Sequence, residues 1–207
     1  VYRPGAGRIV LNGEDVTAMR PDLLARRDMS RTIQNLQIFQ NMSVLDNAIA
    51  GYHLQESGSF LADLLRLPAS RARARAAKDG AMALLARVGL DRAAETEAGN
   101  LSYGKLKRLE IARALALNPK VLLLDEPAAG CNAVETEEID HMIAEVAGSG
   151  VAILLVEHDM KMVMRISNHI VVLDHGEKIA EGDPATVSRN PDVIAAYLGT
   201  EAEAPHA

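Results

Sequence analysis

The sequence predicts an α/β fold organised around a mainly parallel sheet. Residues 121–124 are four apolar residues in a row, a pattern typical of a strand that is buried on both faces between helices. Residues 151–156 predict a second buried strand, and helical patterns over residues 104–117 and 133–146 separate these segments. This alternation of strands and helices favours a parallel sheet that is covered by helices.

Two carboxylates follow the first of these strands. Asp125 and Glu126 stand at the end of the segment VLLLDEP. Open α/β sheets place their ligands beyond the carboxyl ends of the strands, so we expect both side chains to face a substrate. The alternative interpretation is an ordinary solvated loop with two acidic residues.

The composition suits one globular domain without disulfide bonds. The chain has 207 residues, of which 48% are hydrophobic and 24% charged, enough for one sizeable core. Its single cysteine, Cys131, cannot form an internal disulfide or build a metal site alone, which favours a reducing compartment. The net charge of −6 argues against a dedicated nucleic-acid surface.

No apolar run approaches the ~18 residues of a membrane span, and the first residues do not have a signal-peptide pattern. We therefore expect any membrane role to depend on partners. The sequence also contains no G-x-x-x-x-G-K-[ST] phosphate-binding loop. Residues 5–8 lack the lysine and the hydroxyl residue, and they lead into a predicted strand at residues 8–11 instead of a helix. Residues 12–13, Asn-Gly, then predict a hairpin turn.

Five short segments occur in an informative order: RTIQN at 31–35, LSYGK at 101–105, VLLLDEP at 121–127, AAGCN at 128–132 and EHD at 157–159. In this order they strongly resemble the ATP-binding cassette (ABC) ATPases, and the likeness covers nearly the whole chain. The resemblance implies a P-loop NTPase core with a mainly parallel sheet, an antiparallel β piece at the N-terminus and an inserted helical subdomain. It also implies that a phosphate loop precedes residue 1 in a longer parent chain, and that these 207 residues alone are inactive.

The same resemblance assigns catalytic roles and implies ATP and Mg²⁺ as cofactors. Asp125 is the Walker B aspartate that holds magnesium, and Glu126 is the catalytic base. Gln34 is the Q-loop glutamine, which touches both magnesium and the attacking water. His158 is the switch histidine, which contacts the γ-phosphate or orients that water. A solvent-facing side chain is the alternative for Gln34.

The segment LSYGK resembles the signature loop, which in the family binds the nucleotide of a partner subunit. Ser102, Tyr103, Gly104 and Lys105 are therefore expected to contact ATP. A helix that starts near Gly104 points free N–H groups and the positive end of its dipole at an anion. A purely structural N-cap is the alternative for Ser102. Asn132 ends the D-loop and is also expected to contact ATP. The D-loop is expected to cross the interface of a head-to-tail dimer with two nucleotides between the subunits.

The remaining segments predict the outlying elements. A capping box that starts at Ser43 predicts a helix to residue 55. The basic residues Arg71, Arg75 and Lys78 lie on one face of a long helix that runs toward residue 88. We interpret them as a solvated face, with a nucleic-acid or lipid role as the alternative. Further predictions are a helix over 22–27, strands over 32–34, 170–173 and 177–180, a turn over 174–176, and a short helix after 182.

Residues 190–199 resemble the C-terminal helix of ATPases that serve importers of branched-chain amino acids and related amides, with a generic helix as the alternative. We expect one ABC ATPase domain: an antiparallel β piece and Q-loop strand (1–34), a helical subdomain (35–100), the signature, Walker B and H-loop core (101–186) and a C-terminal extension (187–207). The predicted function is hydrolysis of ATP to power an uptake importer.

The implied partners are a second ATPase subunit, membrane permease subunits and, indirectly, a solute-binding protein, at the cytoplasmic face of the inner membrane. A short helix of the permease is expected in a groove near Gln34, with Phe39 as the anchor. Ile38 and Met42 are equally consistent with core positions. A soluble ABC protein without a transport role and a non-catalytic interaction module are the competing functions.

Overall fold

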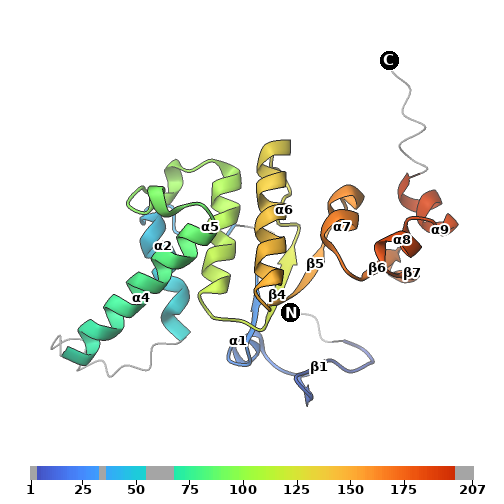
Figure 1. Ribbon diagram of the computed structural model, residues 1–207. Coiled ribbons are helices and arrows are strands. Elements are labelled where there is room, and N and C mark those ends of the chain that lie inside the picture. The colour runs from blue at the N-terminus through green and yellow to red at the C-terminus, as the bar shows by residue number, and fades with distance from the viewer. Residues whose placement is uncertain (1–3, 33–35, 55–67, 199–207) are drawn as a thin grey trace. The chain divides into compact units, whose positions relative to one another are not determined.

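The computed structural model describes residues 4–32, 36–54 and 68–198. The chain divides into two compact units, Val1–Val156 and Glu157–Ala207, and Figure 1 labels most of their helices and strands. Gln34 lies outside the described residues, as do residues 55–67, so the Q-loop prediction and the predicted helix end at residue 55 both fall outside them.

The first unit is organised around a parallel sheet of three strands in the order β3-β4-β5. These strands are β3 (Met29–Arg31), β4 (Val121–Asp125) and β5 (Ala152–Val156). Leu123 of β4 lies beside Arg31 on one side and Leu154 on the other. The predicted parallel sheet and its central strand are confirmed. The strand predicted at residues 32–34 begins earlier and ends at Arg31, although the Thr32 N–H still donates to the carbonyl oxygen of Leu123 at 3.0 Å.

One face of this sheet is covered and the other is open among the described residues. Leu122 and Leu124 of β4 are 0% and 1% exposed, whereas Leu154 and Val156 of β5 are 60% and 57% exposed. The prediction that β5 is a buried strand is therefore wrong. The central strand β4 is fully buried on one face only, because Val121 and Leu123 on its other face are half-buried. Successive side chains of a strand point to opposite faces, and the described helices bury only one of them.

Helices of the first unit pack around this sheet and beside it. The helix α2 (Val44–Ala50) begins at Ser43, whose Oγ accepts a hydrogen bond from the N–H of Asp46 as predicted. The 3₁₀ turn η1 (Gly51–Leu54) follows, so the α-helix is shorter than expected. The helix α4 (Pro68–Arg87) packs against α2 and exposes Arg71, Arg75 and Lys78, as predicted. Exposure suits both a solvated face and its alternative, a nucleic-acid or lipid role, so both stay predictions.

Two further helices begin at predicted functional segments. The helix α5 (Tyr103–Leu115) contacts α2, α4 and α6 (Ala133–Gly148). Both helices were predicted within a few residues of these bounds. The shorter elements are α1 (Pro21–Ala25), the 3₁₀ turns η2 (Asp91–Ala93) and η3 (Ala98–Asn100), and the hairpin of β1 (Val10–Leu11) and β2 (Glu14–Asp15).

The hairpin turn forms as predicted because Asn12 and Gly13 both adopt positive φ angles, 51° and 83°, as a type I′ turn requires.

The second unit is a small α/β structure with its own core. It contains α7 (Met160–Ile166), the antiparallel strands β6 (Ile170–Asp174) and β7 (Glu177–Gly182), α8 (Pro184–Val187), α9 (Pro191–Val193) and the π-helical turn η4 (Ile194–Leu198). Its core consists of Ile170, Val172, Ala180, Val187 and Val193. The Tyr197 hydroxyl donates to the carbonyl oxygen of Leu173 at 2.7 Å, which attaches the C-terminal segment to β6.

Across both units, no helix in the described ranges has the length and apolar character needed to span a membrane.

Candidate functional site

The predicted acidic pair lies at the carboxyl end of the central strand. Asp125 is the last residue of β4, and one of its carboxylate oxygens lies 3.2 Å from an Arg31 guanidinium nitrogen. Glu126 follows with a φ angle of 46°, a left-handed conformation that costs a non-glycine residue about 1–3 kcal/mol. Its N–H donates to the carbonyl oxygen of Val156 at 2.9 Å, so the hydrogen bonding between the strands continues into the acidic pair.

A buried lysine of α5 supports the conformation of Glu126. Lys107 is 2% exposed, and its Nζ lies 3.4 Å from the carbonyl oxygen of Glu126. The same Nζ lies 5.8 Å from the centre of the Tyr103 ring, within range of a cation–π interaction. Lys107 was not among the residues singled out from the sequence. Its spacing from the buried positions Gly104 and Ile111, three before and four after, places it on the inner face of the helix.

The predicted signature loop forms the start of α5. Ser102 is the N-cap, and its Oγ accepts from the N–H of Lys105 at 3.5 Å. Ser102 is therefore an N-cap, and its predicted contact with ATP stays a prediction. The hydroxyl also donates to Oε1 of Glu135 at 2.9 Å, and the Gly104 N–H donates to the same oxygen at 3.3 Å. Glu135, which was not singled out from the sequence, therefore accepts two hydrogen bonds from the signature loop.

Asn132, at the end of the predicted D-loop, caps α6. Its Oδ1 accepts from the N–H groups of Val134 and Glu135, both at 3.0 Å, and the Asn132 N–H donates to Oε2 of Glu135 at 3.3 Å. This is a complete capping box. The Ser102 hydroxyl, followed by the backbone N–H groups of Asn132 and Gly104, lowers the pKa of Glu135 below its ordinary value.

The two loops also touch at Tyr103. A Cβ atom at Gly130 would lie 3.1 Å from the Tyr103 ring, so the ring packs directly on the D-loop backbone. Tyr103 is 42% exposed and Lys105 is exposed. Both side chains are therefore accessible at the start of α5.

The first unit contains seven of the predicted site residues, in two places. Asp125 and Glu126 lie at the end of β4, whereas Ser102, Tyr103, Gly104 and Lys105 lie at the start of α5, where Glu135 joins them to Asn132. His158 belongs to the second unit. Its imidazole ring is exposed, and its backbone N–H donates to a carboxylate oxygen of Glu157 at 3.1 Å.

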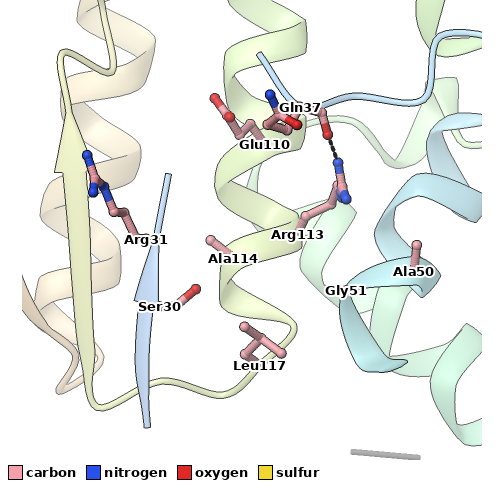
Figure 2. Close-up of a pocket in the computed structure, with 9 residues that line it drawn as sticks. All are labelled: Ser30, Arg31, Gln37, Ala50, Gly51, Glu110, Arg113, Ala114 and Leu117. Atoms are coloured by element: carbon pink, nitrogen blue, oxygen red, sulfur yellow. Dashed lines mark hydrogen bonds between the residues drawn. The ribbon is translucent and has the colours of Figure 1, made fainter. Parts of the chain in front are cut away.

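A cavity of about 180 Å³ lies between β3, the junction of α2 with η1, and α5. Figure 2 shows Arg113 of α5 donating a hydrogen bond to the carbonyl oxygen of Gln37 at the edge of this cavity. Burial lowers the pKa of Arg113. The Arg113 guanidinium carbon lies 5.0 Å from the centre of the Phe39 ring, and Phe39 is 51% exposed beside it.

The donor set around Asp125 fits a magnesium ion that is held mainly by nucleotide and water. Mg²⁺ usually takes one or two carboxylates from the protein and completes its octahedron with phosphate oxygens and water. Asp125 offers such a carboxylate, with its side chain 31% exposed. In the part of the chain that the structure describes, no cluster of three or more His, Cys, Asp or Glu side chains could hold a metal ion without those other ligands.

The parallel α/β sheet carries an acidic pair at the carboxyl end of its central strand, which is where open α/β sheets bind their ligands. The family model described as "ABC transporter" matches residues 1–129, and the model described as "Branched-chain amino acid ATP-binding cassette transporter" matches residues 177–203. The chain belongs to the ABC transporter family and is of the branched-chain amino acid type.

Individual relatives agree with this assignment. The chain is 43% identical to the high-affinity branched-chain amino acid transport ATP-binding protein BraF of Pseudomonas aeruginosa, over 96% of this chain and 78% of BraF. It is 42% identical to LivG of Escherichia coli K12, a protein with the same description, over the same shares. Among solved structures, the ADP conformation of MJ1267, an ATP-binding cassette of an ABC transporter, matches with a TM-score of 0.77 and 30% identity, over 94% of this chain and 78% of MJ1267.

Proposed function

We propose that the protein is the ATP-hydrolysing subunit of an ABC importer for branched-chain amino acids or related amides. The observation that carries this proposal is the 42–43% identity to BraF and LivG over 96% of this chain. The position of Glu126 at the end of β4 supports a hydrolytic role.

Glu126 acts as the general base in this proposal. Its carboxylate accepts a proton from water as that water attacks the γ-phosphorus in line, and ADP leaves with the β-phosphate oxygen. The hydrogen bonds of the Glu126 backbone to Val156 and Lys107 fix the backbone position from which its carboxylate side chain extends. Asp125 would hold magnesium, which would supply positive charge against the β- and γ-phosphates.

The remaining site residues contact the nucleotide, the attacking water or the second subunit. Gln34 contacts magnesium and the attacking water, and His158 contacts the γ-phosphate or orients that water. Ser102, Tyr103, Gly104 and Lys105 bind the nucleotide held by a second subunit, and Asn132 lies at the interface of this head-to-tail dimer. The exposure of Ser102, Tyr103 and Lys105 at the start of α5 supports this arrangement, because a partner's phosphate can reach the helix N-terminus.

The assembled importer includes permease subunits and, indirectly, a solute-binding protein. We place the ATPase peripherally on the cytoplasmic face of the inner membrane. The names of BraF and LivG, both ATP-binding proteins of amino acid transport, support these partners.

The 207 residues contain no G-x-x-x-x-G-K-[ST] loop, and the amides and lysine of such a loop supply most contacts to the β- and γ-phosphates. We infer that this chain alone binds ATP weakly. The test compares the chain with an extended protein, defined as these residues preceded by a segment that carries such a loop. Calorimetry with Mg-ATP should give micromolar binding and steady turnover only for the extended protein.

One outcome would contradict the inference of weak ATP binding by the isolated chain, and another would contradict the proposed ATPase function. Micromolar binding and turnover by the 207-residue chain would overturn the inference about the isolated chain. An extended protein that binds ATP but never hydrolyses it would instead favour a non-catalytic interaction module.

A further inference from the structure

Glu135 connects the starts of two helices that carry different functional loops. Its Oε1 accepts from the Ser102 hydroxyl and the Gly104 N–H at the start of α5, at 2.9 and 3.3 Å. Its Oε2 accepts from the Asn132 N–H at the start of α6, at 3.3 Å. One carboxylate therefore joins the signature loop to the end of the D-loop.

This arrangement goes beyond the capping of α6. A capping box needs only one bond from the glutamate side chain back to the N-cap N–H, which the Asn132 contact supplies. The other oxygen is shared by two donors from α5. Gly104 packs directly on the glutamate, because a Cβ atom at residue 104 would lie 2.5 Å from Cδ and 2.8 Å from Cβ of Glu135. The side chain of Glu135 is thus fitted against the signature loop.

The bonds to Glu135 use the donors that a phosphate would need. A serine hydroxyl has one proton to donate, and the Ser102 proton is directed at Glu135. A γ-phosphate oxygen that takes this proton and the Gly104 N–H must displace Oε1. The negative charge of the carboxylate also repels a phosphate at such short range.

We propose that Glu135 is a positioning residue that holds Ser102 and Gly104 in a resting arrangement and releases them when the γ-phosphate of the partner's nucleotide takes their hydrogen bonds. The proposal rests on the proposed function, in which the signature loop meets a nucleotide in a dimer. Because Oε2 accepts from the Asn132 N–H, a movement of the Glu135 carboxylate away from the signature loop also alters its hydrogen bond to the end of the D-loop. Both loops then respond to one event.

The first experiment uses the 207-residue chain and inorganic phosphate as the probe. Glu135→Gln keeps the size of the side chain but removes its charge, and hydrogen bonds to a neutral acceptor are about half as strong. The amide signal of Gly104, followed by NMR, should respond to phosphate at a concentration about three- to fivefold lower in Glu135→Gln than in the wild type. Glu137→Gln is the matched control, because Glu137 is an exposed acid on the same helix whose carboxylate pairs with His141 at 3.9 Å.

The second experiment measures ATP hydrolysis by the extended protein. Glu135→Gln should lower the KM for ATP about three- to fivefold while kcat changes less than twofold, and Glu137→Gln should change neither. A purely structural role would lower kcat or raise KM. Should Glu135→Gln fail to fold, Glu135→Ala keeps the Asn132 cap of α6 and must give the same ratios.

The outcomes separate this proposal from the proposed function. Equal phosphate response of Gly104 in the wild type and the variant, or an unchanged or raised KM, overturns the role of Glu135 even when the extended protein hydrolyses ATP. A shifted phosphate response in the 207-residue chain, together with an extended protein that lacks ATPase activity, supports the competition at Ser102 and removes the proposed function instead.

Discussion

The Nζ atom of Lys107 lies 3.4 Å from the main-chain carbonyl oxygen of Glu126, the residue that we propose as the catalytic base. Lys107 is almost completely buried on α5, and Glu126 holds a left-handed backbone conformation after β4. The helix that begins at the signature loop thus supports the backbone of the acidic pair. Left-handed non-glycine residues persist only where their surroundings hold them, so this contact has a consequence for activity.

Replacement of Lys107 should therefore reduce turnover more than nucleotide binding. Lys107→Met keeps most of the side-chain volume but removes the donor to Glu126. In the extended protein we expect kcat to fall about tenfold or more, because small displacements of a catalytic group are costly, while ATP affinity changes little. Lys107→Arg should restore most of the activity.

The control for this measurement is Lys78→Met, which removes an exposed lysine of α4. A Lys107→Met variant with normal kcat would show that the contact does not position Glu126.

Glu126→Gln in the extended protein should separate ATP binding from hydrolysis. The amide retains the shape of the side chain but cannot accept a proton from water, so turnover should fall by roughly 10² or more. ATP should still bind, and the ATP-bound dimer should persist longer than that of the wild type. Phosphate release and size-exclusion chromatography in ATP measure the two effects. Near-normal phosphate release, or a dimer that is no longer-lived than the wild type, would remove Glu126 from the role of base.

The open face of the sheet predicts unequal costs for two leucines. Leu122 of β4 is 0% exposed and Leu154 of β5 is 60% exposed. In the 207-residue chain, Leu122→Ala should lower the free energy of unfolding by about 2–5 kcal/mol, because it removes buried methyl groups and leaves a cavity. Leu154→Ala should change it by less than about 0.5 kcal/mol, as is usual for exposed positions. Urea unfolding of both variants checks the difference, and similar costs would mean that the face around Leu154 is covered.

Local patterns in the sequence predicted the elements well. The apolar run at residues 121–124 forms the central strand β4, and the Asn12-Gly13 and His175-Gly176 pairs form hairpin turns with positive φ angles. These features depend on neighbouring residues, because strand patterning and turn conformation are set by the chain over a few positions. The N-cap role of Ser102 at α5, which was the alternative interpretation of this residue, is also a local feature of this kind.

Long-range contacts were not predictable in this way. Lys107 and Glu126 are 19 residues apart, and Ser102 and Glu135 are 33 apart. Whether such side chains meet depends on how α5 packs beside β4 and α6, which no local pattern specifies. The prediction for β5 failed for a related reason. An apolar run reports that its side chains are suited to burial, but their burial depends on segments that cover them from elsewhere.

Phe39 is an exposed aromatic residue whose backbone is held in place by hydrogen bonds, as suits an anchor for a binding partner. Its ring is 51% exposed, so it is not a core residue. The fully buried Asn47 holds the Phe39 backbone from both sides, since its Oδ1 accepts from the Phe39 N–H and its Nδ2 donates to the Phe39 carbonyl oxygen, both at 2.9 Å. Arg113 contacts the ring and borders the cavity in Figure 2. An aromatic side chain on a fixed backbone loses little entropy when it binds a partner.

We therefore predict that Phe39→Ala in the extended protein weakens attachment to the permease subunits. An aromatic anchor can contribute ~2 kcal/mol or more at an interface, so co-purification and coupled uptake should fall strongly. Basal ATPase activity and melting temperature should change little, because the ring is exposed. Ile9→Ala is the matched control, with a side chain that is 50% exposed near the β1–β2 hairpin. An unfolded Phe39→Ala variant would show a core role for the ring, and normal assembly and uptake would place the docking surface elsewhere on the ATPase.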